Sequence, residues 1–160
     1  MNDTNHFPNL ICANHTGFTV HSLEASLNFW VNVLGFKHLY TNTYEAGVFL
    51  DNVVGVEGAS LTLAMIEAPG GHMIELLEYH SPDDIQVFKP RSCDVGAAHL
   101  AFTVKNIDGL LAKIESVGGQ RLGELQTVED GERKGLRLGY VRAPDGLTLE
   151  FLEWPDAPSA

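Results

Sequence analysis

The chain has 160 residues, of which 44% are hydrophobic and 19% are charged, so it can bury a core and is not typical of disordered or fibrous proteins. Its formal net charge of −11 repels a phosphate backbone and disfavours anionic membranes, and no apolar run approaches the roughly 20 residues that cross a bilayer. We therefore expect a small molecule as its substrate, and neither a nucleic acid nor a membrane as a partner. The two cysteines form no disulfide framework and the first residues lack the pattern of a secretory signal, which predicts a cytoplasmic protein.

Two sequence patterns occur twice, in the same order. HTGFTV at residues 15–20 returns as HLAFTV at 99–104, and GHMIELLEY at 71–79 returns as GLTLEFLEW at 146–154. An internal repeat of this kind indicates a duplicated structural unit. We predict a first module at residues 10–79, a connector at 80–94 that has two prolines and no periodicity, and a second module at 95–154, all within one structural domain.

Between the repeated patterns, both modules predict one helix followed by strands. Apolar residues at helical spacing follow Ser22, a suitable N-cap, and continue to Gly35; a second helix begins near Asn106 or Asp108 and ends at Gly118. The expected strands cover residues 36–41, about 46–50, 60–67 and 72–79, and then 120–126, 135–142 and 147–154. The order is β-α-β-β-β twice, which predicts an α+β fold.

The first histidine strand has two different faces. Since side chains alternate along a strand, Phe18 and Val20 lie on one face, and His15, Gly17 and Thr19 lie on the other. The first face suits packing beneath the helix. The second has only small residues beside the histidine, which leaves space where a core would be filled. The second histidine strand divides in the same way.

The two glutamate strands also match each other. Glu75 and Glu150 have largely apolar neighbours along their own faces, and a buried carboxylate must be neutralised, paired or bound to a cation. Glu78 and Glu153 point to the opposite faces, where we expect solvent.

Together these strands predict a metal site. The candidate ligands are His15, Glu75, His99 and Glu150, since two imidazoles and two carboxylates balance one divalent cation and leave positions for water or substrate. Mixed nitrogen and oxygen ligands suit Zn, Ni, Co, Mn or Fe(II). No residue is assigned to an organic cofactor.

The combination of LGF at 34–36, IELLEY at 74–79, GAAHLAFTV at 96–104 and APDGLTLEFLEW at 143–154 resembles the vicinal oxygen chelate superfamily, which includes glyoxalase I, bleomycin resistance proteins and extradiol dioxygenases. The resemblance implies two tandem βαβββ modules that form a cupped, barrel-like mixed sheet around one metal. The superfamily's ligand positions fall on the same two histidines and two glutamates. It also implies a homodimer, with each site formed within one chain or between two.

Within this superfamily the chain looks most like methylmalonyl-CoA epimerase and glyoxalase I. Thr19 and Tyr79 stand where glyoxalase I has an arginine and an asparagine for glutathione, which disfavours glutathione. We therefore predict a divalent-metal-dependent isomerase, epimerase or lyase that abstracts a proton next to a metal-bound carbonyl of a small acyl or 2-oxo substrate. In this hypothesis Glu150 is ligand and principal base, and Glu75 is a second acid/base or only a ligand. The alternatives are a glyoxalase I-type lactoylglutathione lyase, an Fe(II)-dependent dioxygenase, and a small-molecule binding or resistance protein.

Overall fold

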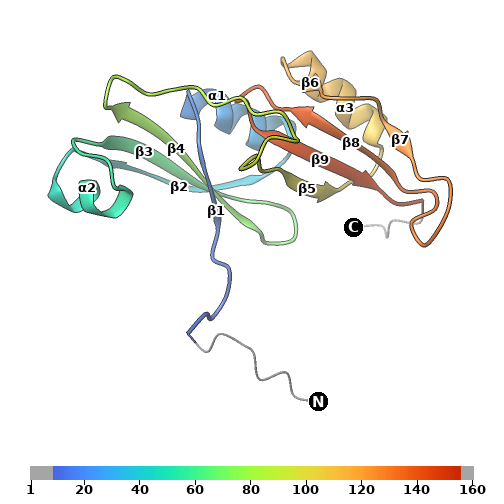
Figure 1. Ribbon diagram of the computed structural model, residues 1–160, viewed down its shortest axis with the longest axis horizontal. Helices are drawn as coiled ribbons and strands as arrows, with labels where there is room; N and C mark the ends of the chain where they lie inside the picture. The colour runs from blue at the N-terminus through green and yellow to red at the C-terminus, as the bar shows by residue number, and fades with distance from the viewer. Residues whose placement is uncertain (1–8, 156–160) are drawn as a thin grey trace.

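Each half of the chain forms its own mixed sheet in the computed structural model, which describes residues 9–155 (Figure 1). The first half contributes β1 (Thr16–Thr19), β2 (Lys37–Tyr44), β3 (Ser60–Glu67) and β4 (Met73–Ser81). The second contributes β5 (Leu100–Thr103), β6 (Gln120–Arg121), β7 (Gln126–Thr127), β8 (Arg137–Arg142) and β9 (Thr148–Glu153). The strand orders are β1-β4-β3-β2 and β5-β9-β8-β6, with β7 also pairing with β8.

The two sheets have equivalent strand pairings. The histidine strand is parallel to the glutamate strand in each, β1 with β4 and β5 with β9, and the remaining pairs are antiparallel. The predicted α+β fold with two βαβββ units is therefore confirmed. Within residues 9–155 the strands form two separate sheets and no closed barrel.

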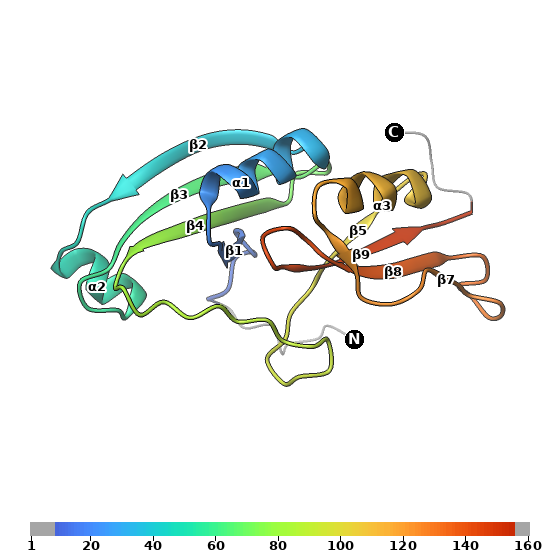
Figure 2. The same cartoon turned by 90° about the horizontal axis from the view of Figure 1, so that it is seen from above.

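Helices cover one side of both sheets. They are α1 (Leu23–Leu27), its continuation η1 (Asn28–Val33) and α3 (Ile107–Ser116), and Figure 2 shows α1 and α3 on the same side of the sheets, opposite the segment that connects the two halves. Ser22 caps α1 by accepting a hydrogen bond from the Ala25 N–H, and Asn106 caps α3 in the same way through Gly109. Phe18 and Val20 pack in the core beneath the helix, as predicted. No helix among the described residues has both the length and the apolarity to cross a membrane.

The first helix changes its winding after one turn. η1 is a π-helix, in which the Leu34 N–H donates to the carbonyl of Phe29, five residues earlier. The wider turn buries the consecutive residues Phe29 and Trp30. The sequence predicted one helix between Ser22 and Gly35 with the 3.6-residue period of an α-helix throughout, and the structure differs from this over η1.

The prediction of a strand near residues 46–50 is wrong. β2 continues to Tyr44, and the next element is the helix α2 (Val48–Val54), which ends at Gly55 in the left-handed region (φ 72°). Three valines in this segment favour a strand locally. Leu50 and Val54, however, are four residues apart and pack on a small second core with Leu61, which stabilises the helix.

The strand predicted at 120–126 is also different in the structure. It is divided into β6 and β7, which pair with opposite ends of β8: Gln120 with Arg142, and Thr127 with Arg137. The Leu122 N–H still donates to the Tyr140 carbonyl of β8 at 2.9 Å, but residues 123–125 are not in the β8 register, so a single continuous strand does not form.

The two halves share one hydrophobic core. An aromatic cluster crosses between them: Trp30 and Phe36 from the first half lie with their ring centroids 6.2 and 5.5 Å from that of Phe102 in the second. Phe102 in turn stacks on Phe151 of β9 at 6.1 Å. The relative position of the sheets is therefore determined by side-chain packing as well as by the connecting segment.

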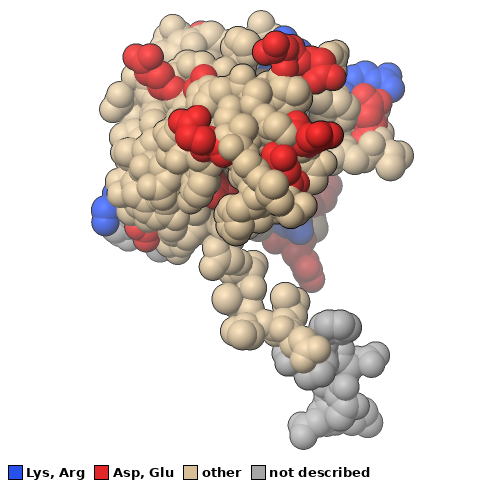
Figure 3. Space-filling model, turned by 90° about the vertical axis from the view of Figure 1, so that its left-hand side faces the viewer, with Lys and Arg blue, Asp and Glu red and all other residues tan. Residues whose placement is uncertain are grey.

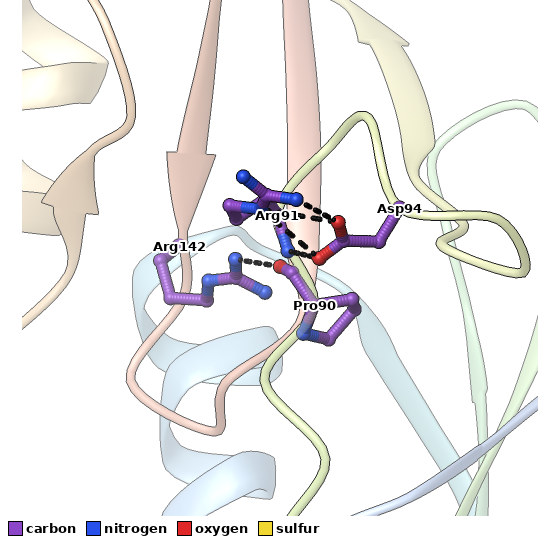
Figure 4. Close-up of polar contacts among 4 residues, drawn as sticks. All are labelled: Pro90, Arg91, Asp94 and Arg142. Atoms are coloured by element: carbon purple, nitrogen blue, oxygen red, sulfur yellow. Dashed lines mark hydrogen bonds and ion pairs between the residues drawn. The ribbon is translucent and has the colours of Figure 1, made fainter.

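An arginine fastens the connecting segment to the second half (Figure 4). The Arg142 guanidinium donates to the carbonyl of Pro90 at 2.6 Å and to that of Gly146 at 3.1 Å. Next to it, Arg91 and Asp94 close a short loop through an ion pair of 2.6 Å. These contacts hold the connector against the turn between β8 and β9.

Candidate metal-binding and catalytic site

Each half places one histidine beside one glutamate. His15 directly precedes β1, and the parallel register aligns Gly17 with Glu75 of β4, which brings His15 Nε2 to 3.5 Å from Glu75 Oε2. In the second half, Ala101 aligns with Glu150, and His99 Nε2 lies 3.2 Å from Glu150 Oε2. The two pairs are thus built by the same strand pairing.

The carboxylates are partly buried but remain accessible from the histidine side. The side chains of Glu75 and Glu150 are 19% and 16% exposed. A Cβ atom placed on Gly17 would lie 3.6 Å from Glu75 Oε2. The lack of a side chain at Gly17 therefore leaves an open approach to the Glu75 carboxylate.

The structure does not bring the four predicted ligands together within one chain. Each pair lies in its own sheet, and no group of three or more histidine, cysteine, aspartate or glutamate side chains in residues 9–155 is arranged to hold a metal ion. The two His–Glu pairs, called half-sites below, are therefore separate within the chain, and the sequence had left open whether a site forms within one chain or between two.

The two histidines differ in what else they contact. His15 Nδ1 lies 2.7 Å from the side-chain oxygen of Asn14, which fixes the ring and leaves Nε2 toward Glu75. His99 Nε2 lies 3.4 Å from the hydroxyl of Tyr140, a residue of β8. The second half-site thus contains a phenol that the first lacks at the corresponding place.

Sequence reasoning missed Tyr140. The reason is that Tyr140 becomes a neighbour of Glu150 only through the antiparallel register of β8 and β9, which the sequence alone does not give. Burial raises the pKa of the Tyr140 phenol, and the neighbouring Glu150 carboxylate raises it further. The pKa of Tyr79 is raised in the same way, first by burial and then by Glu75. Both phenols therefore keep their protons at neutral pH.

Glu78 and Glu153 are not simply solvated, contrary to the prediction. Glu78 Oε2 accepts the backbone N–H of Leu23 at 2.6 Å, and Glu153 Oε1 accepts that of Ile107 at 3.1 Å. Each carboxylate therefore binds the first residue of a helix, where the N–H groups have no partner within the helix. Glu153 also pairs with Arg137 at 2.9 Å.

A cavity adjoins the second half-site. It has a volume of about 500 Å³, and Glu150 and Tyr140 line it together with Ser92, Leu122 and Gln126. Its lining combines two carboxylates, those of Glu124 and Glu150, with a phenol, a hydroxyl, an amide and apolar side chains. This is the kind of lining that binds a small polar molecule.

The profile of the Glyoxalase/Bleomycin resistance protein/Dioxygenase superfamily matches residues 13–151. The chain belongs to this superfamily. Among solved structures, a glyoxalase family protein from Bacillus cereus superposes on it with a TM-score of 0.80 at 24% identity, covering 91% of this chain and 95% of the other. The glyoxalase superfamily fold is thus found both by sequence and by structure.

Curated members of the glyoxalase superfamily that resemble the chain include two kinds of enzyme. The 2-epi-5-epi-valiolone epimerase of Actinomyces sp. is 30% identical over 151 residues, which cover 92% of this chain and 82% of the epimerase. The lactoylglutathione lyase of Salmonella typhimurium is 29% identical over 145 residues, which cover 89% of this chain and 93% of the lyase. Epimerases and lyases of the superfamily are therefore both similar to this chain.

Proposed function

We propose that the protein is a divalent-metal-dependent epimerase, which inverts a stereocentre next to the carbonyl of a small polyhydroxylated ketone. The observation that carries the proposal is the duplicated His–Glu pair, with Nε2–Oε2 distances of 3.5 and 3.2 Å. Two carboxylates in equivalent settings suit a reaction that removes a proton from one face of a carbon and returns it to the other. The similarity to the 2-epi-5-epi-valiolone epimerase over 92% of the chain supports the reaction and the ketone class.

The donor set fits a divalent cation. Two neutral imidazoles and two carboxylates give charge balance, and His15, held through Nδ1 by Asn14, presents Nε2 on the side of Glu75. Acidic side chains are spread over the face of the molecule in Figure 3, with basic ones toward its margins. The net charge of −11 gives an overall field that favours a cation. When bound, the ion would polarise the substrate carbonyl and so make the adjacent C–H more acidic. Zn, Ni, Co, Mn and Fe(II) all suit these ligands.

We propose that a complete site forms between two chains of a homodimer. The reason is the separation of the pairs: His15 and Glu75 lie in one sheet, and His99 and Glu150 in the other. In a twofold dimer, the first pair of one protomer would face the second pair of its partner, and the symmetry would create two equal sites.

The two glutamates have different roles in this proposal. Glu150 takes the proton from the substrate carbon, because it lines the cavity of about 500 Å³ in which the substrate would lie. Glu75, on the opposite side of the assembled site, returns a proton to the other face. The histidines act as ligands only. The open approach over Gly17 gives the substrate access to Glu75.

Lactoylglutathione lyase is the second candidate. Its support is the 29% identity to the Salmonella typhimurium enzyme, which extends over 93% of that enzyme. Thr19 and Tyr79, however, offer no cationic or amide group at the two positions where the superfamily resemblance expects contacts with glutathione. We therefore favour the epimerase.

Proton NMR in heavy water tests the proposal. Protein loaded in turn with Zn, Ni, Co, Mn or Fe(II) is incubated with 2-epi-5-epi-valiolone and, separately, with the hemithioacetal of methylglyoxal and glutathione. We expect metal-dependent deuterium incorporation next to the ketone, its loss in Glu150→Gln, and its retention in Glu129→Gln, a control on an exposed loop. Exchange with the hemithioacetal alone would select the lyase, and exchange with neither compound under any metal would refute proton-transfer chemistry on both.

A further inference from the structure

The two half-sites differ at one position beside the glutamate. β8 aligns Tyr140 with Glu150, whereas the equivalent strand β3 aligns Met65 with Glu75. The strand on the other side of each glutamate offers a small residue in both halves. A phenol and a thioether therefore occupy corresponding places in a site that is otherwise duplicated.

The hydroxyl of Tyr140 lies on the ligand side of His99. It is 3.4 Å from His99 Nε2, and the same nitrogen lies 3.2 Å from Glu150 Oε2. The two rings are 5.0 Å apart between centroids, at an interplanar angle of 45°. Tyr140 thus contacts the nitrogen that faces the carboxylate, unlike Asn14, which holds His15 from the far side through Nδ1.

A cation at His99 Nε2 would release this hydroxyl. The ring nitrogen has one lone pair, which cannot bind a metal ion and accept a hydrogen bond from a phenol at the same time. The released group borders the cavity of about 500 Å³ that Ser92 and Gln126 also line. There its O–H and its oxygen lone pairs are available to a molecule in the cavity.

We propose that Tyr140 is a substrate-contacting residue that hydrogen-bonds an oxygen of the substrate on the Glu150 side of the site. Met65 has no such hydrogen-bonding group and is only 5% exposed, so the substrate binds with its hydroxylated flank toward Tyr140. Glu150 and Glu75 are then not interchangeable, although their strands are repeats. This inference rests on the proposed function, since it assigns the orientation of the ketone in that site.

The first experiment uses Zn²⁺ alone. Titration of the metal-free protein is followed by the ultraviolet difference spectrum of tyrosine and by competition with a chelating dye. We expect a tyrosine signal in the wild type that is clearly smaller in Tyr140→Phe, where Tyr79 beside Glu75 still responds, and unchanged in Tyr44→Phe, a control at the far end of β2. The Zn²⁺ affinity of Tyr140→Phe should stay within about threefold of the wild type, because the phenol is not a ligand. An affinity loss as large as that of His99→Ala would reduce Tyr140 to a residue that orients His99, and would overturn the proposal.

The second experiment measures discrimination between substrates. Exchange of 2-epi-5-epi-valiolone is compared with that of an analogue lacking one ring hydroxyl. If Tyr140 donates or accepts a hydrogen bond to the substrate, Tyr140→Phe should lower kcat/KM about tenfold on the full substrate. On the analogue that lacks the hydroxyl bound by Tyr140, the same substitution should lower kcat/KM much less. If the wild type is active and Tyr140→Phe discriminates between the full substrate and every single-deoxy analogue as the wild type does, the proposed role of Tyr140 is overturned. An inactive wild type would instead overturn the proposed function together with the substrate orientation. In that case the Zn²⁺ titration still decides, separately, whether a cation releases the Tyr140 phenol.

Discussion

The carboxylate of Glu78 in β4 accepts the backbone N–H of Leu23, the first residue of α1, at 2.6 Å. Glu153 of β9 does the same for Ile107, the first residue of α3. In each half the glutamate three positions after the site glutamate therefore binds the start of the covering helix. The strand that positions the site carboxylate and the helix behind it are thus linked directly.

Removing the hydrogen bond between Glu78 and Leu23 should lower the free energy of unfolding without affecting the site. Since a side-chain cap contributes about 1 kcal/mol, we expect Glu78→Ala to reduce the free energy of unfolding by about 1–2 kcal/mol. Urea denaturation followed by circular dichroism measures the change. Glu57→Ala, on an exposed turn, is the matched control and should be nearly neutral. Equal effects of the two substitutions would show that the helix does not need the carboxylate.

A mixture of two inactive variants should regain activity if the site forms between chains. In a heterodimer of Glu75→Gln and Glu150→Gln chains, one site has both native glutamates and the other has neither. Random exchange at a 1:1 ratio should restore about one quarter of the wild-type rate, because half of the dimers carry one native site of two. The deuterium-exchange rate before and after exchange of subunits measures this. Recovery that never exceeds the sum of the two homodimers would contradict a shared site.

A larger side chain at residue 17 should block the metal. A Cβ atom on Gly17 comes within ordinary contact distance of Glu75 Oε2 and of Leu77, at 3.6 and 3.7 Å, so the additional methyl groups of a valine would extend into the approach to the carboxylate. We expect Gly17→Val to lower the affinity for Zn²⁺ at least about tenfold with little change in Tm, since the residue is exposed. Gly17→Ala should bind nearly as well as the wild type. Dye competition measures affinity, and equal affinities of all three proteins would place the cation elsewhere.

Asp145 should make stability depend on pH. It accepts a hydrogen bond from the indole N–H of Trp30 at 2.9 Å, and burial raises the pKa of its carboxyl above the ordinary 3.8. The folded state therefore binds the proton more tightly than the unfolded state. This stabilisation is complete below the unfolded-state pKa and is lost as the pH rises through the folded-state pKa.

The comparison with Asp145→Asn isolates this group, because asparagine keeps an oxygen for Trp30 and does not titrate. We expect the wild type to lose free energy of unfolding relative to the variant as the pH rises from below the ordinary carboxyl pKa toward neutrality. Urea denaturation across that range measures the difference. A difference that stays constant, or that changes in the opposite direction, would show that burial does not control this carboxyl.

The sequence predicted those features of the candidate site that depend on local patterns. The alternation along HTGFTV and HLAFTV separates Phe18 from His15 without knowledge of the fold, and the repeat identifies Glu75 and Glu150 as equivalents. The pairs at 3.5 and 3.2 Å then follow from parallel pairing of the two strands in each half. Whether the two pairs meet depends on how the sheets are placed, which no local pattern contains.

Other features needed tertiary information. The valine-rich segment at 48–54 is a helix because Leu50 packs on the second core, and this contact outweighs strand propensity. Tyr140 becomes a neighbour of Glu150 only through the β8–β9 register. Glu78 has a polar partner only because α1 begins above β4, so alternation alone correctly gave its face but not its environment.

The aromatic cluster of Trp30, Phe36 and Phe102 also bears on how the duplicated halves relate as folding units. Trp30 is completely buried, and part of what covers it comes from the other half of the chain. A fragment ending in the connector would leave these rings facing water, so neither repeat carries a complete interior of its own. The halves are copies in sequence pattern, but each covers part of the other's core.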